Sequence, residues 1–147
     1  MKTKIAQIAL ALLYLFSANL LAENSTTIPG YKIHHNALPT AALDSEVAKA
    51  YQIQRSKYRG LLNVSVIKTQ AGTTGSPAHA IVQAYATNIL GQRIDIPMRE
   101  VKETGAIYYL GEFRITDRET LNFSIKVKPQ GEPRFYKAQL KQQFFID

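Results

Sequence analysis

The sequence has no cysteine among its 147 residues. A chain without cysteine forms no disulfide bond, and it offers no thiolate as a nucleophile or a metal ligand. No lipid-modified cysteine can follow the N-terminal apolar stretch, which excludes a bacterial lipoprotein anchor. Stability must therefore come from a buried apolar core, and the chain is long enough to build one.

Motifs for catalysis are also missing. No serine lies in a G-x-S-x-G turn, no H-E-x-x-H motif occurs, and no spacing selects a pair of carboxylates. We therefore expect a protein that is not an enzyme and that carries no cofactor. An enzyme of unrecognised type is the alternative, which a deep pocket holding His34 or His79 beside an acid would indicate.

The three histidines are weak candidates for a metal site. His34 and His35 are adjacent, and neighbouring residues on a regular strand point to opposite faces, so the pair cannot chelate one ion. His79 and Met98 could join one of them in a soft site for copper. The prediction is no metal, with copper binding as a minor alternative.

The N-terminus has the layout of an export signal. A basic "MKTK" precedes the apolar "IAQIALALLYLFSANLL", and Ala22 is a plausible last residue before cleavage. An uncleaved membrane anchor is the alternative, because the apolar run approaches the length of a membrane-spanning helix. We predict a cleaved signal peptide at residues 1–22 and one periplasmic domain at residues 23–147, with no transmembrane segment after cleavage.

The charge balance is basic. Lysine and arginine number 18 against 11 aspartates and glutamates, and without Lys2 and Lys4 the remaining cations still exceed the acids by five. An exported basic protein favours anionic envelope components such as phosphorylated glycolipids, polysaccharides or phospholipid headgroups. The compartment argues against nucleic acid. A basic domain without an electrostatic partner is the alternative, and the oligomeric state stays open.

Apolar and polar residues alternate from Gly60 onward, most clearly in "TLNFSIKVK" at residues 120–128. Together with the candidate strand "YKIHHN" at residues 31–36, these segments make about seven predicted strands separated by turn signals, which predict an all-β, immunoglobulin-like antiparallel sandwich of two sheets. A small barrel is the runner-up. Asp44 is a natural N-cap for one short helix near the start, and Pro97 predicts an edge strand.

The stretch "RSKYRGLLNVSV" places three cations and a tyrosine directly before a predicted strand. Arginine in a loop suits bidentate recognition of carboxylate or phosphate. The alternative, which we favour, is that the cations fasten the helix to the sheet through the helix C-terminus or through Asp44 and Glu46. The candidate partner-binding residues are Arg55, Lys57, Tyr58 and Arg59.

A second basic surface is predicted on the last two strands. The alternation places four lysines on the same outward side, between asparagine, serine and glutamine. The alternative is that these lysines only keep the sheet soluble and discourage edge pairing. They are Lys126, Lys128, Lys137 and Lys141.

The stretch "NALPTAALDSEVAKAYQIQRSKYRGLLNVSV", together with "GAIYYLGEF", "ETLNFSIKVKP" and "QQFF", resembles a family of small exported gammaproteobacterial proteins. That family is a domain of unknown function, number 4426. The chain departs from it at Gln52, where members usually have glycine, and at Ser45, where proline is common. The resemblance implies an envelope protein with a β-sandwich domain, and it supplies no activity or catalytic residue.

Together these features predict a non-enzymatic periplasmic accessory or binding domain that contacts a protein or an anionic envelope component. The alternative is an assembly domain that adds a strand to a partner at an exposed edge, near Pro97 or at the N-terminal strand. Added salt separates the two, because it weakens electrostatic binding and not strand addition.

Overall fold

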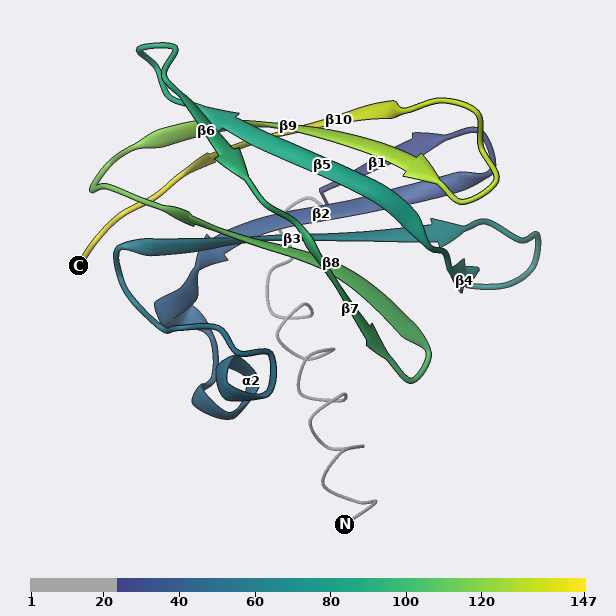
Figure 1. The fold of residues 1–147 in the computed structure, drawn as a ribbon, viewed down its shortest axis with the longest axis horizontal. Helices are drawn as coiled ribbons and strands as arrows, with labels where there is room; N and C mark the ends of the chain where they lie inside the picture. The colour runs from purple at the N-terminus through teal and green to yellow at the C-terminus, as the bar shows by residue number, and fades with distance from the viewer. Residues whose placement is uncertain (1–23) are drawn as a thin grey trace.

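The computed structural model describes residues 24–147, in which two antiparallel β-sheets pack face to face (Figure 1). Sheet A has the strand order β1-β2-β3-β8-β7, with β4 also pairing β3, and sheet B has the order β10-β9-β5-β6. The predicted signal peptide lies outside the described residues. The elements are β1 (Ser25–Ile28), β2 (Tyr31–Pro39), the 3-10 helix η1 (Thr40–Ala42), α2 (Ser45–Ala50), β3 (Arg59–Lys68), β4 (Ser76–Pro77), β5 (Ala80–Thr87), β6 (Arg93–Ile96), β7 (Arg99–Glu103), β8 (Ala106–Arg114), β9 (Thr120–Pro129) and β10 (Tyr136–Gln143).

The predicted fold class, an all-β antiparallel sandwich of two sheets, is confirmed. The described chain has ten strands, where the sequence predicts about seven. The three additional strands are β1, β4 and β7, none longer than five residues. Such short strands bury too few side chains to produce a readable alternation of apolar and polar residues.

The main core lies between the sheets and consists of the inward side chains of both. In β9 the alternation is complete, with Leu121, Phe123, Ile125 and Val127 all at most 2 % exposed. Three phenylalanine rings meet edge to face at one end of this core. Their centroids lie 5.1 Å apart for Phe113 and Phe123, and 5.6 Å apart for Phe113 and Phe144.

The chain changes sheets at Pro97. Strand β6 ends just before this proline at an edge of sheet B, and β7 begins two residues later at an edge of sheet A. The edge position of β6 agrees with the prediction, since proline cannot donate a hydrogen bond to a further strand. No described strand of sheet A pairs with a strand of sheet B, so the sandwich is unclosed, which excludes the barrel.

Helix α2 begins at the predicted cap. The Asp44 Oδ1 atom accepts hydrogen bonds from the backbone N–H groups of Glu46 (2.8 Å) and Val47 (3.4 Å). After the helix, Gln52 has a φ of 56°, in the left-handed region where glycine is the residue without strain. The departure from glycine at this position therefore falls on a helix end and not on a binding site.

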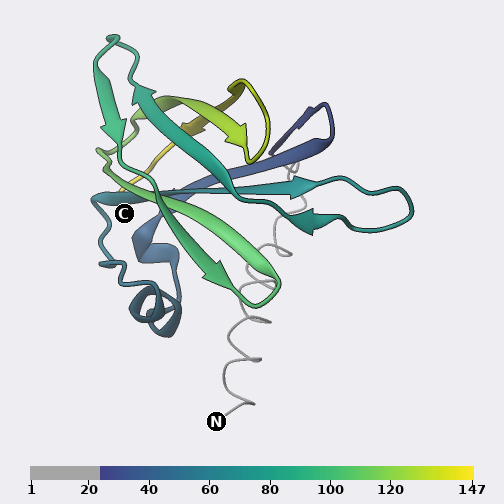
Figure 2. The same ribbon diagram turned by 45° about the vertical axis from the view of Figure 1, so that its right-hand side comes forward.

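The helix covers the outward face of sheet A. A second, smaller core lies between the helix and the sheet. In it Val47 and Ala48 of the helix, and Tyr51 directly after it, cluster with Leu61 of β3 and Leu110 of β8. In Figures 1 and 2 the helix lies on the side of sheet A that faces away from sheet B. Among residues 24–147, no helix covers the outward face of sheet B, so that face is the open surface of the sandwich.

Candidate functional site

The outward face of sheet B carries the four lysines of the second basic surface. The register pairs Lys137 of β10 with Lys126 of β9, and Lys126 in turn lies opposite Gln83 of β5. Lys141 lies opposite Asn122, four residues further along β10. Neighbouring strands are about 4.8 Å apart and alternate residues about 7 Å apart, so the lysines form a small grid of cations. We call this surface the lysine face.

The lysine face includes two further residues, Arg93 and Tyr85, which the sequence did not indicate. The Arg93 guanidinium of β6 lies 3.8 Å from the centroid of the Tyr85 ring of β5. Its Nε atom also donates to Asp95 Oδ1 at 2.8 Å. A hydrogen bond with Ser124, together with the positive charges of the face, lowers the pKa of Tyr85. The alternation through residues 80–87 could have placed Tyr85 there, but the pairing of β6 with β5 was needed for Arg93.

The charge on the lysine face is strongly one-sided. Among the outward positions of the four strands of sheet B, Asp95 is the only acid, and it already pairs with Arg93. The remaining charge on the face is positive, because no other outward carboxylate offsets the lysines. Most acids of the described chain lie elsewhere, on the helix, on β7 and β8 and in the loop before β9.

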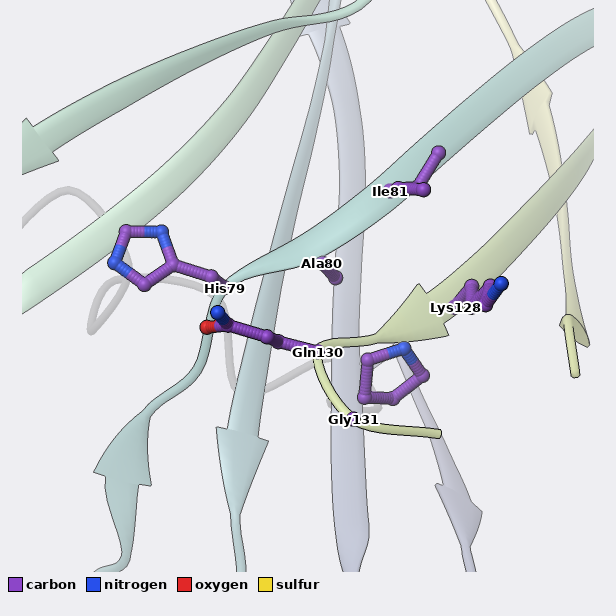
Figure 3. A pocket seen from close by; sticks show the side chains of 7 residues that line it. His79, Ala80, Ile81, Lys128, Gln130 and Gly131 are labelled. Carbon is purple, nitrogen blue, oxygen red and sulfur yellow. The ribbon is translucent and has the colours of Figure 1, made fainter. Parts of the chain in front are cut away.

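A hollow of ≈320 Å³ opens at one end of the lysine face (Figure 3). It lies where the chain enters β5 and leaves β9, and Figure 3 shows His79 and Gln130 on one side of it and Lys128 on the other. The Gln130 N–H donates to the His79 carbonyl oxygen at 2.8 Å, which joins the two segments. The lining residues are His79, Ala80, Ile81, Lys128, Pro129, Gln130 and Gly131.

A chain of hydrogen bonds runs inward from His79. Its Nδ1 atom lies 3.3 Å from Glu100 Oε2, and the buried Tyr109 hydroxyl donates to the same oxygen at 3.0 Å. The Tyr109 oxygen accepts the Ala80 N–H at 2.7 Å. Burial raises the pKa of Tyr109 to about 12, and the hydrogen bonds from His79 and Tyr109 lower the pKa of Glu100. This chain ties β5 of one sheet to β7 and β8 of the other.

His79 thus lies beside an acid, but the hollow is open to solvent. Its lining residues include no serine, threonine or cysteine that the His79–Glu100 pair could activate as a nucleophile. The arrangement accounts for the placement of His79 as a polar tie between the two sheets.

The structure separates the three histidines. His35 points into the sandwich and is 6 % exposed, with its Nε2 atom 3.1 Å from Thr26 Oγ1. Its Nδ1 atom is buried and has no hydrogen-bond partner within the described residues. Nor does any group of three or more histidines, cysteines or acids in residues 24–147 come together in a way that could hold a metal ion.

The buried His35 predicts a loss of stability in mild acid. Burial and the nearby His34 lower the pKa of His35, so the folded state resists protonation that the unfolded state accepts below about pH 6.5. The free energy of unfolding should therefore fall as the pH drops from about 7.5 to about 5.5, above the range in which carboxylates titrate. Thermal unfolding across this window tests the prediction. A His35→Leu variant should lose most of the pH dependence and a His79→Gln variant should keep it, whereas equal slopes for all three proteins would contradict this.

The segment before β3 is held from within by Thr40, which is fully buried. The Thr40 hydroxyl lies 2.9 Å from the Gln54 carbonyl oxygen and 3.1 Å from that of Ser56, and it accepts the Ser56 N–H at 2.9 Å. The backbone of residues 54–56 is therefore fixed on the start of η1, directly after β2.

The cations of that segment divide into two kinds. Arg55 donates from Nη2 to the Ala41 carbonyl oxygen at 3.0 Å, and Arg59 Nη2 lies 3.3 Å from Glu112 Oε1. Lys57 and Tyr58 are exposed, with the Lys57 Nζ atom 5.3 Å from the centre of the Tyr58 ring. The contacts of both arginines lie within the fold, although Ala41 and Glu112 are not the partners that the sequence suggested.

The helix C-terminus is held by a different cation. The Arg99 guanidinium of β7 donates to the carbonyl oxygen of Tyr51, the residue at which α2 ends. A cation at the C-terminal carbonyls of a helix complements the partial negative charge there. This residue was not predicted, because 48 positions of sequence separate the two groups.

The family model for the domain of unknown function DUF4426 matches residues 25–147. The chain belongs to the DUF4426 family. Among solved structures, this DUF4426 chain is similar to a crystal structure of a DUF4426 family protein from Pseudomonas aeruginosa PAO1. The two are 33 % identical, the match covers 88 % of this chain and 99 % of the other, and the TM-score is 0.73.

The DUF4426 fold also resembles FetP of uropathogenic Escherichia coli strain F11, which was expressed recombinantly in the periplasm. Identity is 9 %, the match covers 84 % of this chain and 94 % of FetP, and the TM-score is 0.60. A copper-bound variant of FetP matches with 8 % identity, coverage of 84 % and 95 %, and a TM-score of 0.59. At these identities the likeness shows the fold alone.

Two further findings bear on this DUF4426 protein. No curated protein matches the chain. Within the part of the chain that the structure describes, no helix is long and apolar enough to cross a membrane.

Proposed function

We propose that this DUF4426 protein is a non-enzymatic binding domain of the periplasm, which contacts an anionic component of the cell envelope through the lysine face. The observation that carries the proposal is the one-sided charge of this uncovered face. Four lysines stand on the adjacent strands β9 and β10 and Arg93 stands on β6, with Asp95 as the single acid among the described outward positions of sheet B. A flat grid of cations suits an extended anionic surface better than a small ligand.

The lysine face is preferred over the segment around Arg55 as the contact surface. Arg55 and Arg59 already have partners within the fold, in Ala41 and Glu112. Arg55, Lys57 and Tyr58 of that segment are exposed, which leaves fewer exposed cations for a partner than the lysine face, where Lys126, Lys137, Lys141 and Arg93 are all exposed.

Periplasmic location is supported by two observations. The N-terminal 22 residues have the layout of an export signal. A protein of similar fold, FetP, was obtained by expression in the periplasm. Strand addition is less favoured, because β2, the N-terminal strand considered for it, lies inside sheet A between β1 and β3, and β6 has only four residues.

The proposal predicts that removal of lysine charges releases the protein from envelope material. A Lys126→Gln/Lys137→Gln/Lys141→Gln variant should bind sedimented envelope fragments at least about tenfold more weakly at low salt, since each cation near an anionic surface contributes roughly 1 kcal/mol. Binding of the wild type should also fall with added salt.

The matched control removes three exposed lysines from other parts of the molecule. A Lys49→Gln/Lys68→Gln/Lys102→Gln variant has the same net charge and leaves the lysine face intact. It should bind like the wild type. Equal loss in the two variants would mean that only net charge matters, and no loss in either would refute the proposal.

A further inference from the structure

The hairpin that joins β5 to β6 presents two large apolar side chains to solvent. Ile89 is 83 % exposed and Leu90 is 78 % exposed, the highest values among the large hydrophobic residues that the structure describes. In both views the hairpin projects beyond the body of the sandwich (Figures 1 and 2). Exposed apolar residues that contribute nothing to the core point to a contact outside the chain.

The tip of this hairpin is held in one conformation. The Asn88 side chain accepts the N–H groups of Leu90 (3.0 Å) and Gln92 (2.9 Å), and it donates to Gln92 Oε1 at 2.7 Å. Gly91 follows with a φ of 79°, which glycine adopts without strain. The two apolar side chains are thus displayed on a braced turn, so ordering them on a partner costs little conformational entropy.

Two other exposed aromatic residues lie at the same end of the sandwich. The Tyr58 carbonyl oxygen accepts the Ile115 N–H at 3.0 Å, and the Phe144 N–H donates to the Glu119 carbonyl oxygen at 2.9 Å, which brings Tyr58 and Phe145 to the loop before β9. The register of β5 with β9 places the hairpin tip beyond this same end. In Figures 1 and 2 the tip, this loop and the C-terminus lie along one side of the molecule.

Cations surround this apolar end. Arg93 and Lys141 occupy the row of the lysine face nearest the tip, since both align with the pair Thr87 and Asn122. Two of the acids at this end pair with arginines, Asp95 with Arg93 and Asp117 with Arg118, while Glu119 accepts hydrogen bonds from Thr116 and Asp147 is the last residue of the chain. Apolar side chains beside cations are the combination that binds an anionic bilayer, in which headgroups attract the charge and the acyl boundary accepts the apolar groups.

We propose that this protein binds anionic phospholipid bilayers at their surface, with Ile89 and Leu90 entering the headgroup region and the adjacent cations contacting the phosphates. This inference rests on the proposed function and specifies its anionic component as a phospholipid surface. The charge around the tip favours this partner over a purely apolar protein pocket or a second copy of the chain, which carries the same positive face.

A tryptophan reporter tests the insertion directly, because the chain has no tryptophan of its own. The protein is expressed from its whole coding sequence, recovered from the periplasmic fraction and mixed with phosphatidylglycerol vesicles. In a Leu90→Trp variant the emission should shift to shorter wavelength and be quenched by brominated lipid. An Ile81→Trp control, at an exposed site about 25 Å away along β5, should show neither change.

A second measurement compares vesicle partition of matched apolar variants. Ile89→Ser/Leu90→Ser should reduce partition into phosphatidylglycerol vesicles about tenfold or more, while Ile81→Ser/Phe135→Ser, at two other exposed apolar residues near the opposite end of sheet B, should reduce it far less. Thermal unfolding should be the same for both. Wild-type protein should bind phosphatidylcholine vesicles far more weakly.

The inference is overturned if the tip variant partitions like the wild type, if both tryptophan reporters respond alike, or if the tip variant changes only self-association. A tip variant that still sediments with envelope fragments, while the three-lysine variant does not, would overturn this inference and leave the proposed function standing. If the tip variant loses both partition into phosphatidylglycerol vesicles and sedimentation with envelope fragments, the bilayer is supported as the partner.

Discussion

A Gly60→Ala variant is expected to lose about 2–3 kcal/mol of its free energy of unfolding, because the position has no room for a methyl group. A Cβ atom built on Gly60 would lie 2.3 Å from both Cε2 and Cζ of the Phe113 ring. The ring cannot move aside freely, since it packs edge to face on Phe123 and Phe144. Any shift of Phe113 would therefore disturb the whole aromatic cluster.

Urea unfolding measures this loss as a lower midpoint at an unchanged slope. The matched test is the double variant Gly60→Ala/Phe113→Leu, in which the smaller side chain makes space for the new methyl group. The double variant should lose less free energy of unfolding than the two single variants lose together, because the two residues are in contact. Strict additivity would show that the loss has another cause.

This result would explain the glycine in the stretch "RGLLNVSV". The backbone at Gly60 does not have a positive φ, so no left-handed conformation requires glycine there. Glycine is required there by the close approach of β8, whose residue Phe113 pairs with it. The reason is packing and not a binding role.

A Thr40→Val variant is expected to lose about 2 kcal/mol, because valine keeps the volume of threonine and removes its hydroxyl. Thr40 is fully buried. Its hydroxyl oxygen accepts the Ser56 N–H, and its one hydrogen lies within reach of the carbonyl oxygens of Gln54 and Ser56. Without the hydroxyl these groups lose partners in a place that solvent does not reach. The segment from Gln54 to Ser56 should then detach from the start of η1.

Thermal unfolding and amide exchange together test this. The Ser56 N–H should exchange faster in Thr40→Val, and Thr40→Ser, which keeps the hydroxyl, should restore most of the protection and the stability. An equal loss for valine and serine would mean that the methyl group of Thr40 matters more than its hydrogen bonds. Unchanged exchange at Ser56 would contradict the role assigned to the hydroxyl.

These two predictions clarify the basic segment at residues 55–59. Its backbone is held by Thr40, and its arginines contact Ala41 and Glu112. Neither contact involves α2, so the interpretation that these cations fasten the helix to the sheet stays a prediction, as does a binding role for the exposed Lys57 and Tyr58.

Local periodicity was enough to predict the long strands and the fold class. The alternation at residues 121–127 has a period of two, and this property depends only on neighbours along the chain. The cap at Asp44 and the edge position next to Pro97 follow from local chemistry in the same way, since each concerns the hydrogen bonds of one backbone segment.

Only the tertiary structure decided which side chains meet. Strand β5 pairs with β9, about forty residues later, and β6 adds Arg93 to the lysine face from the far edge of β5. Sequence alternation assigns a residue to one side of its own strand, but it carries no information on which strands become neighbours. The partners of Arg59 and Arg99, and the end of the sandwich shared by the hairpin tip and Phe145, depend on those long-range pairings.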